Sequence, residues 1–366
     1  MKPNVPQHRW LRRLAAALAF AALTVVLCLG LNFLLVDDIH SYTRVMLGEL
    51  YAQSGQIDTL FLGASHCYRS FDPQIVDERL GTRSFVAGTS QQLPDGSWYL
   101  LQEAAAENDL ETVYLEMFYT GYVQDSSSAV PMACYLITDY MRPTSPNRYA
   151  YLWEMGGPAA FADLIFPARH AIVSPDELPE LWLAKLTDGY TIGNYRYVTY
   201  PEEGEEYRGN GFVYTSGVTP YGYEAILDVD PAQPVSAFGL EYLQKITDFC
   251  RDSGIDLVLV TAPVPNAFCA NTANYQAYLT AVQQFADANG LPVWDFTLYR
   301  DADAIGMEVD CFADAHHLNG EGAARFTQVF CDTVAAHQQG EDVSARFFST
   351  LEEKVRTAPD ATYALR

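Results

Sequence analysis

The fold of this chain is decided by residues 58–73, which read DTLFLGASHCYRSFDP. The apolar run from Thr59 to Leu62 is typical of a buried strand, and Gly63 marks its end. Asp72-Pro73 has the form of a helix N-cap followed by proline at the first helical position. The stretch therefore places Ser65 on a turn at the carboxyl end of a strand, where open α/β sheets bind their ligands.

Further strand and helix patterns lie on both sides of a long central region. Ser84–Ala87, Thr112–Phe118, Ile255–Thr261 and Leu291–Phe296 have the pattern of strands, and helical patterns separate them. This alternation predicts an α/β fold with a doubly wound parallel sheet. Residues 119–234 are rich in Tyr, Pro and Gly instead, and we interpret them as a large insertion that covers the ligand edge of the sheet.

The N-terminus carries a membrane signal. Arg9, Arg12 and Arg13 precede Leu14 to Val36, a run without a charged residue. At about 1.5 Å per residue this run can cross roughly 30 Å of hydrocarbon. Because positive residues stay on the cytoplasmic side, the rest of the chain should face outward. A cleaved signal peptide is the alternative, but no small-x-small site precedes Asp37, so we expect one retained transmembrane helix.

These signals predict six segments along the chain. A basic cytoplasmic tail (1–13) and the anchor (14–36) come first. An α/β domain follows in two parts (37–118 and 235–340), separated by the insertion (119–234), and a C-terminal tail (341–366) closes the chain.

The net charge and the cysteine spacing exclude some classes of binding partner and leave the disulfide pairing open. The formal net charge of −24 argues against binding to nucleic acid, and against binding an anionic membrane surface through basic patches. The membrane contact that we expect is therefore the N-terminal helix. Seven cysteines are scattered without a CxxC pair, so their spacing specifies no disulfide pairing.

A second chemically distinctive stretch, DAHHLNG at residues 314–320, offers a carboxylate and two imidazoles just before a helix. A serine hydroxyl becomes a good nucleophile when a histidine takes its proton and a carboxylate orients that histidine. We therefore predict Ser65 as the nucleophile, His317 as the general base and Asp314 as the orienting carboxylate. The spacing from the carboxylate favours His317 over His316 as the base.

Gly63-Ala-Ser65, Gly88 and Asp314-x-x-His317 resemble three motif blocks of the SGNH/GDSL hydrolase superfamily. The resemblance covers about residues 58–118 and 236–336. It implies a flavodoxin-like sheet, hydrolysis or transfer of an O-acyl ester, and no cofactor. It also implies an oxyanion hole built from the backbone N–H groups of Ser65 and Gly88.

The layout of anchor, early serine and late Asp-x-x-His is also similar to membrane-anchored O-acyl enzymes of the cell envelope, such as those of the lipoteichoic acid D-alanylation type. That likeness implies an acyl ester of an envelope glycopolymer as substrate and a membrane acyltransferase as partner.

The chain departs from the superfamily pattern in several places. Gly-Asp-Ser is Gly-Ala-Ser here, followed by His66, and the Gly-x-Asn-Asp block is absent. The side chain of Gln91, or that of Gln92, is therefore our candidate for the third oxyanion donor. Glu116, at the end of the third predicted strand, is expected to hydrogen-bond the site and not to act as a second catalytic carboxylate. His316 is expected to be an accessory neighbour.

Two other interpretations remain open. His66-Cys67, Cys311 and His316-His317 include soft metal ligands, but they lack the paired spacing of a zinc site, so we expect no metal. The competing class is a catalytically degenerate, glycan-binding or scaffold protein with the same fold. The two classes are distinguished by Ser65, which is activated as a nucleophile in an enzyme and is not activated in a binding or scaffold protein.

Overall fold

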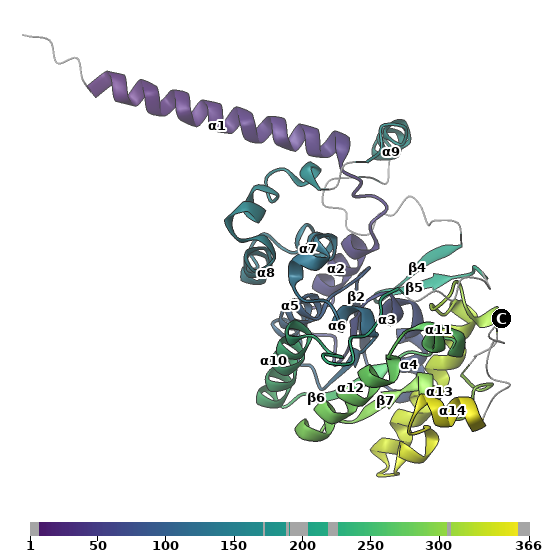
Figure 1. The fold of residues 1–366 in the computed structure, drawn as a ribbon. Coiled ribbons are helices and arrows are strands. Elements are labelled where there is room, and N and C mark those ends of the chain that lie inside the picture. The colour runs from purple at the N-terminus through teal and green to yellow at the C-terminus, as the bar shows by residue number, and fades with distance from the viewer. Residues whose placement is uncertain are drawn as a thin grey trace, which may run out of the picture.

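The computed structural model describes residues 7–170, 173–187, 190, 204–218, 226–305 and 309–357. At its centre lies a five-stranded sheet in the order β2-β1-β3-β6-β7, in which every neighbouring pair is parallel (Figure 1). The strands are β1 (Thr59–Gly63), β2 (Ser84–Gly88), β3 (Thr112–Glu116), β6 (Asp256–Thr261) and β7 (Val293–Asp295). The predicted doubly wound parallel α/β fold is confirmed.

Helices cover both faces of the sheet, and for this reason the side chains in the middle of its strands are apolar. Successive side chains of a strand point to opposite faces. Leu60 and Leu62 accordingly pack into one buried cluster with Leu243 of α10, while Phe61 packs into another with Phe330 of α13. The covering helices are α2 (Tyr42–Ala52), α3 (Ser65–Ser70), α4 (Pro73–Leu80), α5 (Pro94–Ala105), α10 (Ala237–Ser253), α12 (Tyr275–Asn289) and α13 (Gly320–Gln338).

Local signals fix the ends of α4 as the sequence predicts. The Asp72 side chain accepts a hydrogen bond from the backbone N–H of Gln74, and Pro73 is the first helical residue. Gly81 ends the helix with φ +73°, a left-handed conformation that glycine adopts at low cost. Because α4 is short, the chain returns to the sheet soon after β1 and forms β2 beside it.

The region between β3 and α10 holds short elements outside the central sheet. In order they are α6 (Tyr119–Tyr122), η1 (Ser127–Ala129), α7 (Pro131–Thr138), α8 (Pro146–Gly156), η2 (Gly157–Ala162), η3 (Pro167–Arg169), α9 (Leu178–Lys185) and an antiparallel hairpin of β4 (Glu205–Gly209) and β5 (Phe212–Thr215). The remaining elements are α11 (Asn266–Asn271), η4 (Phe296–Leu298), η5 (Val309–Cys311), η6 (Val343–Arg346) and α14 (Leu351–Thr357). The domain boundaries inferred from the sequence stay a prediction.

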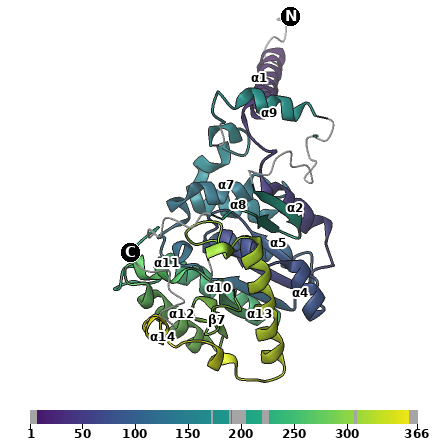
Figure 2. The same ribbon diagram turned by 90° about the vertical axis from the view of Figure 1, so that its right-hand side faces the viewer.

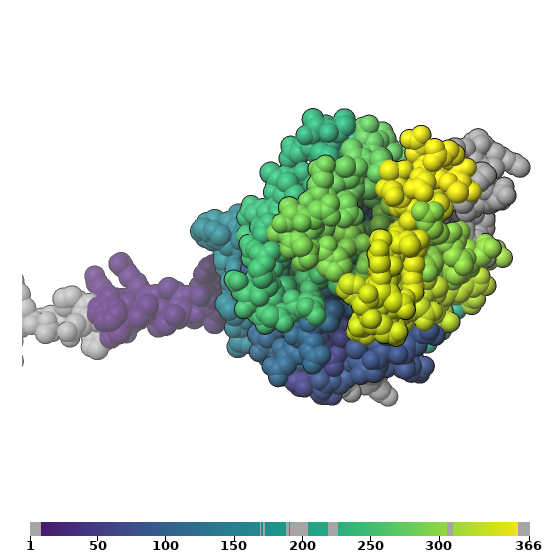
Figure 3. Space-filling model, turned by 90° about the horizontal axis from the view of Figure 1, so that it is seen from below, coloured from purple at the N-terminus to yellow at the C-terminus, as the bar shows by residue number. Residues whose placement is uncertain are grey.

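The N-terminal helix α1 (Gln7–Leu35) projects from the rest of the molecule as a single rod (Figure 3). The most apolar stretch within Arg9–Leu35 has a mean hydropathy of 2.6, and this stretch is not buried in the protein. By length and composition α1 is able to cross a membrane.

All seven cysteines lie in the described residues, and none of them forms a disulfide. Six are buried in the α/β part of the chain or in the helices packed on it, and Cys28 belongs to α1. The folded domain therefore depends on its two apolar cores for stability.

Candidate active site

The turn that carries Ser65 is shaped by a close approach of two strands. A Cβ atom on Gly63 would lie 2.7 Å from Cβ of Glu116 and 3.0 Å from Cβ of Cys67, so only glycine fits at this position. The chain then enters α3, with Ala64 as N-cap and Ser65 as the first helical residue. The N–H of Ser65 is in the first turn of the helix, where backbone donors have no intrahelical acceptor.

Ser65, His317 and Asp314 form one continuous hydrogen-bonded chain. Nε2 of His317 lies 2.6 Å from Oγ of Ser65, and its Nδ1 lies 2.8 Å from Oδ2 of Asp314. The other carboxylate oxygen, Oδ1, accepts the backbone N–H groups of His316 at 3.0 Å and of His317 at 2.9 Å. The carboxylate thus holds both the loop and the imidazole, and it favours the tautomer with the proton on Nδ1. This is the geometry by which a histidine activates a serine.

Burial sets the protonation state of the imidazole. It lowers the pKa of His317 below the ordinary value of 6.5, and the neighbouring Asp314 opposes this shift only in part. Burial alone would raise the pKa of Asp314, but its hydrogen bond to His317 and the charge of that ring hold the pKa well below the usual range. At neutral pH the histidine is therefore neutral and the carboxylate ionised, as a general base requires.

An arginine that the sequence patterns did not single out braces this carboxylate. Arg69 follows Ser65 by four residues on α3, and its guanidinium forms an ion pair with Glu205 of the hairpin strand β4. Its Nη1 atom also lies 3.8 Å from Oδ2 of Asp314. The sequence could have indicated Arg69, because it follows Ser65 by one helical turn and so lies on the same side of α3. The partner, 136 residues further along, could not be predicted from spacing.

The rings of His66 and His316 lie beside that of His317, which is the imidazole bonded to Ser65. The ring of His66 stacks on Phe118, with centroids 3.5 Å apart, and lies 4.5 Å from the ring of His317. Its Nε2 is 3.2 Å from both the carbonyl oxygen and Nδ1 of His316. Burial lowers the pKa of His66, and it lowers that of His316 to about 3. Two neutral rings therefore support the imidazole of His317.

The three imidazoles could also hold a metal ion, since ring nitrogens of His66, His316 and His317 lie within 4.8 Å of one another. Cys67 and Cys311 are not members of this group. Both nitrogens of His317 are already engaged, one by Ser65 and one by Asp314. A metal bound through Nε2 of this ring would have to displace the serine hydroxyl, so metal binding and serine activation exclude each other.

Gly88 and Gln91, two of the predicted oxyanion residues, have different surroundings: Gly88 is tightly packed, whereas Gln91 is exposed. Gly88 abuts the serine turn closely: a Cβ on it would lie 3.1 Å from the carbonyl oxygen of Gly63 and 3.2 Å from Cβ of Tyr68. Gln91 lines the cavity at Ser65 and is exposed, with φ +54°, an uncommon conformation for a residue with a side chain. Its amide can reach a bound ligand.

Gln92 is not placed to be an oxyanion donor. Its Nε2 donates to the carbonyl oxygen of Ala87 at 3.3 Å and to Oγ of Ser97 at 2.9 Å, while its Oε1 accepts from Thr89. The side chain is buried, and its amide hydrogens stabilise the turn after β2.

Glu116 lies beneath the serine turn, and its carboxylate is bonded to backbone groups. Its carboxylate accepts the backbone N–H of Phe118 at 3.1 Å and that of Ala262 at 3.5 Å. Burial raises its pKa to about 8, so the group is protonated at neutral pH. Its position fits the expected structural role and not that of a catalytic carboxylate.

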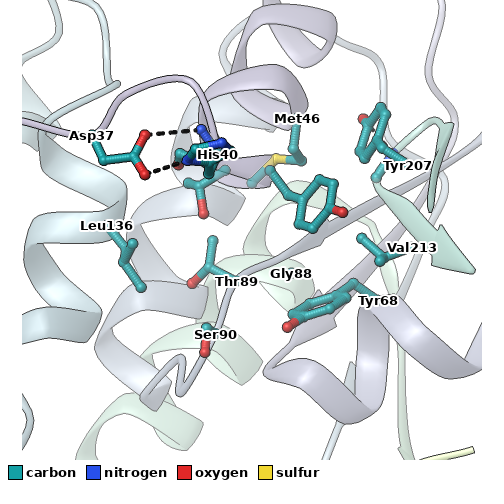
Figure 4. A pocket seen from close by; sticks show the side chains of 14 residues that line it. Asp37, His40, Met46, Tyr68, Gly88, Thr89, Ser90, Leu136, Tyr207 and Val213 are labelled. Atoms are coloured by element: carbon teal, nitrogen blue, oxygen red, sulfur yellow. Dashed lines mark hydrogen bonds and ion pairs between the residues drawn. The ribbon is translucent and has the colours of Figure 1, made fainter. Parts of the chain in front are cut away.

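Two neighbouring cavities meet at this site. The first, of about 420 Å³, contains Ser65 and His317 and is bounded on its apolar side by Phe118, Val130 and Leu227. The second, of about 250 Å³, shares Tyr68 and Ser90 with the first and extends from Gly88 to Asp37 and His40 (Figure 4).

Asp37 and His40 are joined by hydrogen bonds at the far end of this second cavity (Figure 4). Because α1 ends at Leu35, that end lies close to the N-terminal helix. The cavity thus links the surroundings of the helix to the oxyanion side of the triad.

Comparisons with known proteins add limited information. A family model without a descriptive name matches residues 225–338, which is less than half of the chain. No curated protein matches the sequence. Among solved structures, the chain is similar to a GDSL-like lipase from Bacteroides thetaiotaomicron with 9% identity and a TM-score of 0.37, over 82% of this chain and 100% of the lipase chain. A likeness this weak assigns no residue, so the function has to be argued from the site itself.

Proposed function

We propose that this protein is a membrane-anchored serine esterase or O-acyltransferase of the SGNH/GDSL type that acts outside the cytoplasm. Ser65 is the nucleophile, His317 the general base and Asp314 the residue that orients it. The observation that carries the proposal is the unbroken hydrogen-bonded chain from Asp314 through His317 to Ser65.

The reaction begins with attack of Oγ of Ser65 on the carbonyl carbon of an acyl ester, while Nε2 of His317 takes the hydroxyl proton. The backbone N–H groups of Ser65 and Gly88, with the amide of Gln91, donate to the oxyanion that forms. His317 then gives its proton to the departing alkoxide, which leaves an acyl-serine. Water or an acceptor hydroxyl then attacks the acyl group while His317 takes its proton. His317 gives this proton to the departing Oγ of Ser65, which restores the serine hydroxyl and the neutral imidazole.

The substrate class is an acyl ester of a cell-envelope glycopolymer. This part of the proposal is supported by location, because a helix able to span a membrane holds the site near the envelope. A membrane acyltransferase that supplies or receives the acyl group is the partner consistent with transfer. The competing candidate is a glycan-binding or scaffold protein in which the triad is inactive.

A fluorophosphonate probe tests the proposal directly, because it reacts only with an activated serine. The intact protein should be labelled, and Ser65→Ala should abolish labelling while circular dichroism stays unchanged. EDTA should leave labelling and ester hydrolysis intact. Loss of hydrolysis in EDTA with recovery in zinc would instead assign the three histidines to a metal. A wild type that resists the probe and hydrolyses no ester would favour the non-catalytic candidate.

A further inference from the structure

The end of α1 is held by a segment far away in sequence. Nδ2 of Asn32 donates to the carbonyl oxygen of Ile165 at 3.0 Å, and the N–H of Ala168 donates to Oδ1 of Asn32 at 3.4 Å. The N–H of Val173 donates to the carbonyl oxygen of Leu35 at 3.2 Å. The polar side chain of Asn32, which would be costly in lipid, is thus satisfied by protein.

Helix α9 completes this arrangement. Nε1 of Trp182 donates to the carbonyl oxygen of Leu34 at 2.7 Å, and Nζ of Lys185 donates to those of Phe33 at 2.7 Å and Val36 at 2.5 Å. The last four carbonyl groups of a helix have no intrahelical donor, and without partners they are costly near lipid. Here α9 supplies the missing donors, and both ribbon views place it beside the end of α1 (Figures 1 and 2).

The depth of these contacts follows from the length of α1. About 20 helical residues cross roughly 30 Å of hydrocarbon. Counted from Leu14, the first residue after the arginines, the far boundary of the hydrocarbon falls near Phe33. The residues bonded to the end of α1 therefore lie at the boundary between lipid chains and headgroups.

At this depth the segment exposes large apolar side chains. Ile165 is 52% exposed, Trp182 41%, Leu183 71% and Leu186 79%. On α9 the opposite side, with Leu181 and Lys185, is buried. Tryptophan with its N–H bonded and its ring exposed is typical of a membrane interface.

We propose that Ile165, η3, α9 and Leu186 form a juxtamembrane collar that inserts its apolar side chains into the outer leaflet of a phospholipid bilayer. The inference rests on the proposed function only in that α1 is a retained membrane anchor. The exposed charged residues described on α9 and just before it are acidic (Asp176, Glu177 and Glu180), and Lys185 is buried against Asp38. The insertion is therefore apolar and does not depend on anionic lipid.

The collar has a consequence for the site. It fixes α1 to the domain at several points, so the domain cannot swing freely on a linker. Asp37 and His40, which bound one end of the second cavity, are then held close to the lipid headgroups. An acyl donor carried by the membrane would meet the cavity at that end.

Quenching of tryptophan fluorescence by brominated lipids tests the collar in the full chain, reconstituted in phosphatidylcholine nanodiscs. Trp10, at the cytoplasmic end of α1, is first replaced by phenylalanine. In this background lipids brominated close to the headgroup should quench the emission more than lipids brominated near the chain ends. Trp182→Phe should reduce that quenching several-fold. Trp294→Phe is the control, because Trp294 is buried in β7, which lies on the side of the domain far from α1 and α9, and its loss should not reduce the quenching.

Two further observations separate the collar from the anchor. Replacing phosphatidylcholine partly with phosphatidylglycerol, or raising the salt, should leave the quenching unchanged. If the protein resists extraction by alkaline carbonate but Trp182→Phe does not alter quenching, the collar is wrong and the anchor stands. If carbonate extracts the full chain, the anchor itself fails, and the collar fails with it.

Discussion

Of the two adjacent histidines, His316 and His317, only one is placed to act as the general base. The ring of His317 is hydrogen-bonded to both Ser65 and Asp314. Nδ1 of His316 instead lies 3.2 Å from Nε2 of His66 and 4.0 Å from Oδ1 of Asp314. His317→Ala should therefore lower kcat/KM for an acetyl ester by about 10⁴-fold or more, since triad members act as a unit. His316→Ala should cost far less, because it removes a stacked neighbour and leaves the proton path intact. Asp314→Asn should fall between the two, through loss of the correct tautomer.

Steady-state kinetics on purified variants, with labelling by the fluorophosphonate as a second readout, measures this order. Circular dichroism of each variant shows that it is folded. If His316→Ala proves as damaging as His317→Ala, the assignment of the base is wrong even though a serine enzyme remains.

At the residue scale the sequence predicted that Ser65, Asp314 and His317 meet, and the structure brings them together, but their catalytic roles stay a prediction. The residues that support them were not predicted. The Asp-x-x-His spacing was sufficient, because three residues of one loop place both side chains toward one point. The brace by Arg69 and Glu205 and the stack of His66 on Phe118 join residues from separate elements. Such pairs depend on how elements pack, which local spacing does not encode. Gln92 fails as a donor for the same reason, since its partners lie around the β2–α5 turn.

Among the elements outside the central sheet, the β4–β5 hairpin contacts the site through Glu205, which pairs with Arg69 beside Asp314. Asn210 and Gly211 form its turn with φ +50° and +84°, and the carbonyl oxygen of Asn210 accepts the N–H of Val86 in β2. Asn-Gly is the preferred pair for a two-residue hairpin turn, so this element was readable from the sequence. Interpreting residues 119–234 only as an aromatic-rich insertion missed it. The parallel strands were easier, because their apolar runs are continuous.

Two glycines of this hairpin provide a matched pair of variants. Both have positive φ, but a Cβ on Gly211 would lie 1.8 Å from the carbonyl oxygen of Val86, whereas one on Gly209 would have nothing within 4 Å. Gly209→Ala should cost roughly 1–2 kcal/mol of backbone strain. Gly211→Ala should destabilise the protein more and lower kcat several-fold, because the displaced hairpin carries Glu205 away from Arg69. Chemical denaturation and ester hydrolysis measure both effects, and equal losses would contradict this account.

The end of strand β3 makes the stability of the protein depend on pH. Burial raises the pKa of Glu116 to about 8, from the ordinary value of 4.5. Between these values the folded protein holds a proton that the unfolded chain has released, so the free energy of unfolding should fall as the pH rises through this range. Below pH 4.5 the stabilising contribution of this group is fully present.

Glu116→Gln removes the ionisable group but keeps the hydrogen-bonding shape. Its free energy of unfolding should vary less with pH between about 6 and 8 than that of the wild type. Asp295, whose pKa burial raises to about 6, leaves some dependence at lower pH in both proteins. Glu341→Gln, at an exposed position, is the control and should follow the wild type. Parallel curves for wild type and Glu116→Gln would show that the carboxyl group is ionised in the fold.

For the whole molecule, the arrangement of arginines before an apolar helix predicts which side of the membrane the α/β domain occupies. Protease added to intact cells should digest the region after Val36, while an engineered tag before Arg9 stays protected. The protein should remain in the membrane fraction throughout. Appearance of a shorter, soluble species in the medium would show cleavage, and protection of the domain would show the opposite orientation.

The cysteines described above form no disulfide, and this has a consequence for how the domain would reach its native state if it is exported as we propose. Six buried thiols with no cross-link mean that no oxidation step has to occur between secretion and folding. The chain needs neither a thiol oxidase nor an isomerase, and it can fold in a reducing or oxygen-free envelope as well as in an oxidising one. The sheet is completed when β3 pairs with β6, although more than a hundred residues of chain lie between these two strands.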